Sequence, residues 1–331
     1  MLIKFAVKNF RGFAERIEWD LSHPSNYSFN TYAVKDGVIK NGIIYGPNGS
    51  GKSNFALAIF DIEYHLSVKW KKADYLSNYV YIGNPNSPVE FEYVFKFGND
   101  ILEYRYSKNA SGMLIAESLV ANNKQVFKRE NDVFEIDDDQ FRIDATVKEN
   151  FKQNVNSVSV INFLTASFPF PQDHYIVKLV LFVNTMLWFK NLDSREFIGL
   201  ETSSFSLEEF IIQNHYTEDF SEFLERVSEQ HFKFIHPKEG DKNLYCEIGG
   251  NTIPFLLIAS TGTQALELLY VWVKRMSGAS FVFIDEFDAF YHFKLAFEVC
   301  KQLFNLNCQV FTSSHNTYLM TNVLLRPDCN F

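Results

Sequence analysis

The sequence of 331 residues has few cysteines and no long apolar run. The four cysteines form no Cys-x-x-Cys pair and no cluster with histidine, which excludes the common zinc and redox motifs and predicts reduced thiols in a core. The longest uncharged apolar stretch, residues 179–189, is far shorter than the roughly 20 residues that span a bilayer. We expect this stretch to be a buried helix. The first residues hold no apolar run of signal-peptide length, and we expect a cytoplasmic protein with no membrane partner.

The sequence also lacks an excess of positive charge. It has 31 Lys and Arg against 40 Asp and Glu, a formal net charge of −9 and a pI of about 5.4. This balance disfavours DNA as a partner, although it leaves room for a local basic patch. Sustained heptads are missing, so we expect no long coiled-coil arm. Internal repeats, low-complexity segments and flexible linkers are missing as well.

A glycine-rich stretch is the most specific feature that is present. It reads Gly46-Pro47-Asn48-Gly49-Ser50-Gly51-Lys52-Ser53, followed by Asn54. It matches the phosphate-loop pattern G-x-x-x-x-G-K-[ST], between an apolar run and a stretch typical of a helix. Glycines allow successive backbone N–H groups to face an anion, and the helix start adds its dipole. We expect Lys52 to reach the β- and γ-phosphates and Ser53 to bind Mg²⁺. A chance match would occur in about one chain in a hundred of this length.

The second half of a nucleotide site is expected at residues 281–286. Four apolar residues end in Asp285 and Glu286, as in a buried parallel strand whose carboxyl end meets a ligand. Asp285 would hold Mg²⁺, commonly through water, and Glu286 would orient or deprotonate the attacking water. Alone the pattern is weak, because many strands enter a turn in this way, but a phosphate loop upstream makes it strong.

Two further motifs each have an alternative interpretation. Residues 310–315 predict a strand that ends in small hydroxyls and His315, which would donate to the γ-phosphate; taken alone, this residue is better explained as a loop histidine. The stretch Ser260-Thr261-Gly262-Thr263 opens a helix and predicts a second anion-binding turn. Because one chain has one phosphate loop, this turn would close on nucleotide held by another subunit. The alternative is a plain helix cap.

The remaining patterns predict the organisation of the chain. Residues 2–20 predict two strands with a turn at Arg11 and Gly12, and residues 38–45 predict one strand before the phosphate loop, with a helix after it to about residue 72. Residues 78–143 alternate as an antiparallel meander, in which the acidic run 137–139 fits a solvated turn better than a metal site. Residues 145–235 look helical, with one helix over 174–190 and another capped by Ser206 with Glu209. Strands near 244–248, 280–284 and 308–312 then alternate with helices near 263–276 and 291–304.

In this order the motifs resemble those of ABC-type ATPase heads of the RecF/SMC/OLD kind, as in small bacterial AAA ATPases of anti-phage and abortive-infection systems. The stretch Asn9-Phe10-Arg11-Gly12-Phe13 resembles the N-terminal element of that group. Residues 46–53 resemble Walker A, 260–263 the degenerate signature, 281–286 Walker B, and His315 the switch histidine. The resemblance covers nearly the whole chain, but residues 65–255 match in layout only.

The resemblance implies an α/β P-loop NTPase with a mixed core sheet, an antiparallel β subdomain and an inserted helical lobe. We expect a single head divided at about residues 77, 144 and 243. It implies ATP and Mg²⁺ as ligands, with Lys52, Glu286 and His315 as catalytic residues and Ser53 and Asp285 as metal ligands. It also implies head-to-head dimerisation with ATP between Walker A of one subunit and Ser260, Gly262 and Thr263 of the other. Arg11 would approach the nucleotide from the N-terminal strands.

The sequence departs from the group in four places. The D-loop, often Ser-Leu-His-Pro, corresponds to Phe290-Tyr291-His292-Phe293, which leaves the coupling between two sites in doubt. Asn316 follows the switch histidine where Asp is frequent. Gln153 and Gln172 are candidates for the Q-loop by position only. The sequence ends where another strand is expected to begin, and many members of the group continue further.

The leading functional hypothesis is a slow ATPase that senses or regulates in bacterial defence and controls a separate effector such as a nuclease, because this chain has no nuclease motif. A DNA-repair or chromosome-associated head is the second reading. The third is a non-hydrolysing scaffold that ATP locks into an oligomer, which the altered D-loop keeps open. Membrane transport is not expected.

Overall fold

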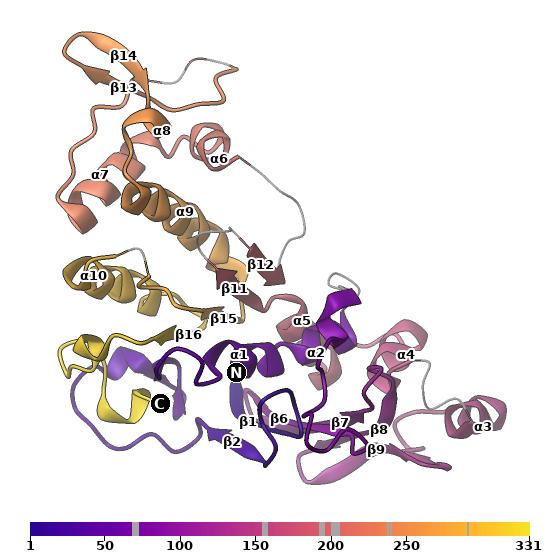
Figure 1. Cartoon of the computed structure of the whole chain (residues 1–331). Helices are drawn as coiled ribbons and strands as arrows, with labels where there is room; N and C mark the ends of the chain where they lie inside the picture. Colours follow the sequence, from indigo (N-terminus) through magenta and orange to yellow (C-terminus); the bar gives the residue numbers. More distant parts are fainter. Residues whose placement is uncertain are drawn as a thin grey trace. The chain divides into compact units, whose positions relative to one another are not determined.

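The chain folds into two compact units in the computed structural model (Figure 1). The structure describes residues 1–67, 73–153, 158–191, 196–199, 206–236, 238, 240–289 and 291–331. The first unit comprises Met1–Asn26, Val34–Ile39 and Gly49–Met186, and the second comprises Tyr27–Ala33, Lys40–Asn48 and Leu187–Phe331. The chain therefore passes from the second unit into the first within the phosphate loop, between Asn48 and Gly49.

The first unit is built on a seven-stranded antiparallel sheet in the order β10-β9-β8-β7-β6-β1-β2. The strands are β1 (Leu2–Lys8), β2 (Ile17–Asp20), β6 (Val89–Phe97), β7 (Asp100–Lys108), β8 (Leu114–Ala121), β9 (Lys124–Glu130) and β10 (Val133–Ile136). A small ribbon, β3 (Val34–Lys35) with β4 (Val38–Ile39), belongs to the same unit. Alternating side chains give the sheet one buried and one charged face. The predicted strand pair and meander are confirmed, and β1 pairs with β6 to make them one sheet.

Helices cover the buried face of this sheet (Figure 1). They are α1 (Lys52–Ile59), α2 (Asp61–Leu66), α3 (Ala145–Gln153), α4 (Val160–Ser167) and α5 (Tyr175–Asn184), with the 3₁₀ turn η2 (Ala73–Leu76). Aromatic pairs join the layers: Phe55 of α1 packs edge-on against Phe5 at 5.8 Å between ring centres, and Phe182 of α5 against Phe95 at 5.2 Å. The core of the unit is therefore strongly aromatic.

A buried polar cluster lies between α2 and this sheet. The fully buried Asp61 accepts hydrogen bonds from the hydroxyls of Tyr75, Tyr79 (2.7 Å) and Tyr106 (2.7 Å), and it pairs with Lys108 at 2.6 Å. Burial lowers the pKa of Lys108, while burial and the charge of Asp61 raise the pKa values of the three tyrosines well above 10. A buried charge is tolerated only when it is paired and hydrogen-bonded in this way.

The second unit contains a five-stranded mixed sheet in the order β12-β11-β15-β16-β5. Its strands are β5 (Asn41–Tyr45), β11 (Leu187–Asn191), β12 (Glu196–Gly199), β15 (Phe281–Ile284) and β16 (Gln309–Ser314). All neighbours are parallel except the edge strand β12. The remaining elements are η1 (Thr31–Ala33), α6 (Leu207–Gln213), α7 (Thr217–Ser228), the hairpin β13 (Tyr245–Ile248) with β14 (Asn251–Pro254), α8 (Phe255–Ile258), α9 (Thr261–Arg275), η3 (Met276–Gly278), α10 (Phe293–Phe304), η4 (Thr317–Leu319) and η5 (Pro327–Cys329).

The end of the chain runs beside β5. Asn330 forms an isolated parallel bridge with Ile43, and the Phe331 carbonyl accepts from the Tyr45 N–H at 2.8 Å. Gly42 is required here, because a Cβ at this position would lie 2.7 Å from the Phe331 ring. The strand expected to begin at the C-terminal residues is thus present as a short bridge.

Three predicted elements are wrong or shorter than expected. The helix over 174–190 ends at Asn184, and the apolar residues Leu187–Asn191 form β11 instead, because a short apolar run fits a buried strand as well as a helix. Residues 145–243 consequently hold two strands. The strand over 38–45 is split at Lys40, which donates to the Phe304 and Leu306 carbonyls at 3.1 and 2.7 Å. The helix after the phosphate loop is interrupted at Phe60, and α2 ends at Leu66; residues 68–72 lie outside the described part.

Other expectations agree with the structure. The Ser206 hydroxyl accepts from the Glu209 N–H, as the capping pattern predicts. All four cysteines are buried and in no disulfide. In the acidic run, Asp137 pairs with Lys124 at 2.6 Å.

In the described ranges of the chain, no group of three metal-binding side chains is found, and no helix is long and apolar enough to cross a membrane.

Candidate nucleotide site

The phosphate loop joins β5 to α1. Gly49 and Gly51 have φ angles of +79° and +100°, in the left-handed region that favours glycine. Gly51 is the N-cap of α1, and a Cβ there would lie 3.1 Å from the Phe13 ring. Lys52 is buried, whereas the Ser53 side chain is exposed in the first turn of α1. These glycines therefore shape the backbone as a phosphate cradle requires.

The N-terminal element of residues 9–13 is a tight turn in the same unit. Phe10 and Phe13 exchange backbone hydrogen bonds of 3.0 and 2.8 Å, and Arg11 has a positive φ of 48°. A Cβ on Gly12 would lie 3.8 Å from the Asn54 side-chain nitrogen, so the turn lies against the start of α1. The Arg11 guanidinium donates to the Tyr75 carbonyl at 2.9 Å. Its approach to a nucleotide stays a prediction.

The two acidic residues follow β15 in the second unit. Asp285 is 4% exposed, and its carboxylate accepts from the Ser313 hydroxyl. Glu286 is exposed, and its N–H donates to the Ser313 Oγ at 2.8 Å. The φ angle of Glu286 is 45°, which costs about 1–2 kcal/mol for a residue with a Cβ. The Ala289 N–H also donates to the Glu286 carbonyl at 3.0 Å, and each of these two hydrogen bonds contributes about 0.5–1.5 kcal/mol against that cost.

A second serine organises the loop that carries His315. The Ser314 hydroxyl donates to Asp288 at 2.7 Å and accepts from the Asn316 N–H at 2.8 Å. His315 itself is exposed, between these two fixed points. The Gly46 N–H donates to the Ser314 carbonyl at 3.3 Å, so the first residue of the phosphate loop lies beside this strand end.

Sequence reasoning gave no role to Ser313, Ser314 or Asp288. The information lies in the register of two parallel strands, in which Ile284 faces Thr312. This register places Asp285 next to Ser313 at the same sheet edge. A run of small hydroxyl residues after one strand, beside acidic residues after another, is the pattern that would have indicated these contacts.

The signature stretch caps α9. The Ser260 hydroxyl accepts from the Thr263 N–H at 3.2 Å, and the buried Thr263 hydroxyl donates to Gln230 at 2.9 Å. Ser260 and Thr261 are exposed, and Gly262 is partly exposed. Within this chain the stretch is therefore a helix cap with an accessible outer side.

The D-loop stretch is linked to the signature helix. The Tyr291 hydroxyl donates to the Ala265 carbonyl of α9 at 3.1 Å. His292 is the N-cap of α10 and has no side-chain capping bond, while Phe290 lies outside the described residues. The Q-loop candidate Gln153 bonds to Glu149 within α3 at 3.1 Å.

The predicted site residues fall into two groups. The first unit brings Gly51, Lys52, Ser53 and Asn54 together with the turn of Arg11, and the second holds Gly46, Asp285, Glu286, His315 and the signature stretch. The hydroxyl of Ser53 and the carboxylate of Asp285 are hard oxygen ligands that suit Mg²⁺. The left-handed glycines suit the phosphates. The residues present therefore fit ATP with Mg²⁺.

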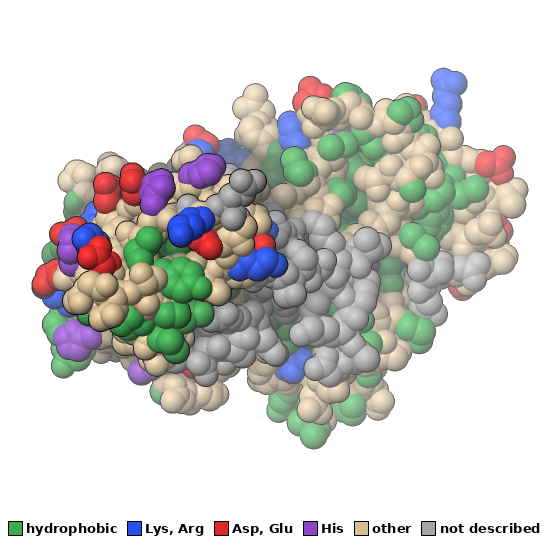
Figure 2. Space-filling view, turned by 90° about the horizontal axis from the view of Figure 1, so that it is seen from above, with side chains coloured by type: hydrophobic (Ala, Val, Ile, Leu, Met, Phe, Trp, Pro, Cys, Tyr) green, Lys and Arg blue, Asp and Glu red, His purple; other side chains and the backbone are tan. Residues whose placement is uncertain are grey.

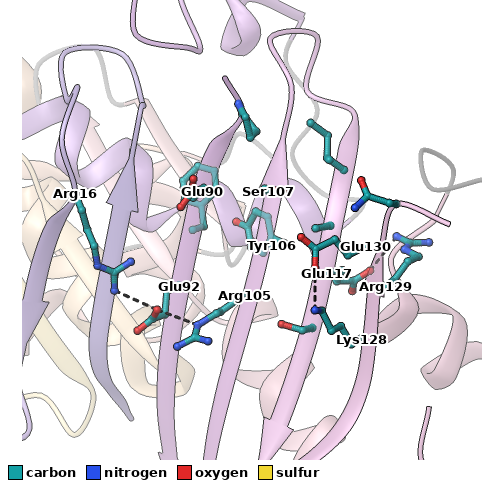
Figure 3. Close-up of a pocket in the computed structure, with 16 residues that line it drawn as sticks. Arg16, Glu90, Glu92, Arg105, Tyr106, Ser107, Glu117, Lys128, Arg129 and Glu130 are labelled. Carbon is teal, nitrogen blue, oxygen red and sulfur yellow. Dashed lines mark hydrogen bonds and ion pairs between the residues drawn. The ribbon is translucent and has the colours of Figure 1, made fainter. Parts of the chain in front are cut away.

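A hollow of about 540 Å³ lies on the charged face of the seven-stranded sheet, apart from these motifs (Figure 3). Its ionic side chains pair with one another: Glu92 accepts from Arg16 at 3.1 Å and from Arg105 at 2.9 Å, and Lys128 pairs with Glu130 at 2.9 Å. This is the behaviour of a solvated sheet face, in which each exposed pair contributes little.

Exposed apolar side chains gather on the second unit. Ile248, Leu256 and Leu257 are 48%, 42% and 77% exposed on the β13–β14 hairpin and α8, directly before the signature stretch. Figure 2 shows an apolar group bordered by charged and histidine side chains on this part of the surface. Tyr318 and Val323, 83% and 71% exposed, follow the switch histidine.

Comparison with known proteins identifies the family and the fold. The family model described as "AAA domain, putative AbiEii toxin, Type IV TA system" matches residues 43–321. No curated protein matches the chain.

Among solved structures, an Smc head bound to the C-winged helix domain of ScpA is 14% identical, with a TM-score of 0.50 over 97% of this chain and 92% of that one. The SMC head domain from Thermotoga maritima is 17% identical, with a TM-score of 0.46 over 97% and 91%. An Smc head domain with an extended coiled coil, bound to the C-terminal domain of ScpA from Pyrococcus furiosus, is 13% identical, with a TM-score of 0.46 over 97% and 91%. The first of these likenesses confirms the predicted fold class, an α/β fold like that of an Smc head.

Proposed function

We propose, from the premise that the chain belongs to the AAA-domain family described as putative AbiEii toxins of type IV toxin–antitoxin systems, that it binds and hydrolyses ATP. The observation that carries the proposal is the strand end at which the buried Asp285 is followed by Glu286: β16 separates this strand, β15, from β5, which leads into the phosphate loop. ABC-type heads pair these two elements for phosphoryl transfer.

Each residue has a role that follows from its chemistry. Lys52 and the loop N–H groups would stabilise charge on the transferred phosphoryl group. Ser53 and Asp285 would hold Mg²⁺, which would neutralise negative charge on the phosphate oxygens. Glu286 would orient the attacking water and accept its proton, and the exposed His315 would donate to the γ-phosphate.

The test compares wild type with Glu286→Gln and with Glu222→Gln, a change of another exposed glutamate away from the motifs. We expect Glu286→Gln to bind ATP with nearly unchanged affinity and to lose at least about 100-fold in hydrolysis rate, as for loss of a general base. Glu222→Gln should behave like wild type. Equal rates in all three proteins would refute the role of Glu286, and absence of ATP binding in wild type would refute the function itself.

ATP-dependent dimerisation is the second part of the proposal. The outer side of the signature stretch is accessible, and the exposed Leu257 and Tyr318 lie close in sequence to the signature stretch and the switch histidine, respectively. Exposed apolar groups of this kind favour a surface that another protein covers. Light scattering with and without ATP tests it: Glu286→Gln should double in mass only with ATP.

For the biological role we favour a sensor or regulator in bacterial defence that controls a separate effector such as a nuclease. The family description, which names a putative toxin of a toxin–antitoxin system, supports the part of this proposal that concerns bacterial defence. Expression of the chain with its neighbouring genes should reduce phage plating, and Glu286→Gln should abolish the effect. An efficiency of phage plating that is the same with and without the chain would exclude this role.

A chromosome-associated head is the second candidate. The likeness to an Smc head bound to a winged-helix domain of ScpA favours it, because such a head carries a partner domain. It predicts ATP-dependent DNA binding whose affinity falls steeply with salt, which the net charge of −9 disfavours. Tight ATP binding with turnover near background would instead select a non-hydrolysing scaffold.

A further inference from the structure

One buried hydroxyl serves both acidic residues of the candidate site. Ser313 is fully buried at the end of β16, and its Oγ donates its proton to Asp285 Oδ1. The same oxygen accepts the N–H of Glu286 at 2.8 Å. A serine hydroxyl has one proton to give, so its orientation is fixed by these two contacts together.

The contact with Glu286 acts on a strained residue. Glu286 has a left-handed φ of 45°, which an L-residue adopts only when its surroundings hold it there. Its peptide is held by Ser313 on the N–H side and by the Ala289 N–H on the carbonyl side. This backbone conformation sets the direction in which the exposed Glu286 carboxylate leaves the strand end.

We propose that Ser313 is a positioning residue for ATP hydrolysis, whose single hydroxyl fixes the Asp285 carboxylate and the main chain of Glu286 in one arrangement. The proposal rests on the proposed function. Ser313 touches neither substrate nor metal in this role; it couples the placement of the metal-binding carboxylate to that of the water-activating one. Loss of the hydroxyl would release both residues at once.

Two neighbours on the same strand serve as controls. Thr312 is equally buried, and its hydroxyl has no hydrogen-bond partner among the residues that the structure describes, so Thr312→Val removes a buried hydroxyl of no consequence for the site. Ser314 is also fully buried and bonds to a carboxylate, but to that of Asp288. Ser314→Ala therefore matches the structural cost of Ser313→Ala without touching Asp285 or Glu286.

The experiment measures kcat and KM for ATP, and separately the affinity for Mn²⁺ by electron paramagnetic resonance in the presence of a non-hydrolysable ATP analogue. We expect Ser313→Ala to lower kcat and to weaken Mn²⁺ binding by about 10- to 100-fold each, with little change in KM, as for groups that orient metal ligands. Ser313→Thr keeps the hydroxyl and should restore both. Thr312→Val should match wild type, and Ser314→Ala should keep wild-type Mn²⁺ affinity.

The outcomes separate the two proposals. Wild-type kcat and Mn²⁺ affinity in Ser313→Ala would overturn the positioning role and leave the ATPase standing. Equal losses of Mn²⁺ affinity in Ser313→Ala and Ser314→Ala, at equal melting temperatures, would overturn it as well. A wild-type protein that neither binds nor hydrolyses ATP would overturn the proposed function first.

Discussion

The ring of Phe13 lies so close to Gly51 that a Cβ at residue 51 would be 3.1 Å from it. The turn of residues 9–13 therefore packs directly on the last glycine of the phosphate loop. The turn is itself held from the other side, because the Arg11 N–H donates to the Tyr79 carbonyl at 3.0 Å and Tyr79 bonds to Asp61. The N-terminal element thus supports the start of α1 from the buried polar cluster.

This contact predicts different effects for two loop glycines. Alanine at residue 49 or 51 would have to adopt a left-handed backbone conformation, which lowers the free energy of unfolding by about 1–2 kcal/mol. A Cβ at Gly49 meets no atom within 4 Å, whereas one at Gly51 also presses on Phe13. Gly51→Ala should therefore unfold at lower urea concentration than Gly49→Ala, and Phe13→Leu should recover part of the difference. Equal midpoints for the two variants would contradict the contact.

The buried cluster predicts a large effect at Asp61. Asp61→Asn leaves Lys108 fully buried without its counter-charge, which should cost about 3–5 kcal/mol in the free energy of unfolding. Asp61→Asn combined with Lys108→Met removes both charges and should be less destabilised than the single variant. Urea denaturation measures the free energy of unfolding of the two variants. A double variant that is less stable than Asp61→Asn alone would argue against the pairing.

The tyrosines of the first unit predict a loss of stability in alkali. Burial, assisted by Asp61 or Glu117, raises the pKa values of five tyrosine hydroxyls well above 10: Tyr75, Tyr79, Tyr93, Tyr104 and Tyr106. Because these groups keep their protons in the folded state, their contribution is intact below pH 10 and is lost as the pH rises above it. Each of these tyrosines should lower the free energy of unfolding by about 1.4 kcal/mol for every pH unit above 10, up to the pKa that it has in the folded state.

The lowered pKa of the buried Lys108 acts in the opposite direction, but one lysine does not offset five tyrosines. We therefore expect cooperative unfolding shortly above pH 10, with circular dichroism and phenolate absorbance changing together. Gradual ionisation of these tyrosines around pH 10 in a protein that stays folded would show that they are accessible.

The sequence predicted those features that depend on local rules. The phosphate loop has a fixed spacing, and the strand before Asp285 is apolar throughout, so both could be located without a structure. The strand β11 could not, because Leu187, Trp188 and Phe189 are apolar residues whose short run fits either element. It becomes a strand because β15 offers a parallel partner, in which Val282 pairs with Leu187.

The contacts of Ser313 were beyond local rules as well. They depend on the register in which β16 lies beside β15, and that register is a property of the assembled sheet. The position of the Arg11 side chain is similar, since its acceptor on Tyr75 is 64 residues away in the sequence. Local patterns thus indicate which chemistry is present, whereas tertiary pairing decides which side chains hold it in place.

The exposed apolar residues of the second unit lead to a prediction about assembly. Leu257 is 77% exposed three residues before Ser260, and its burial in an ATP-bound dimer would favour association. In the Glu286→Gln background, Leu257→Asp should weaken the ATP-dependent dimer at least tenfold, about 1.4 kcal/mol, and leave ATP affinity unchanged. Val133→Asp is the matched control, because Val133 is 49% exposed on β10, the edge strand of the seven-stranded sheet that lies farthest from β1 and β2. Sedimentation at several concentrations measures the dissociation constant of the dimer. Equal dissociation constants for the two variants would place Leu257 outside the interface. Weaker association in Leu257→Asp alone would place the surface before the signature stretch within the interface.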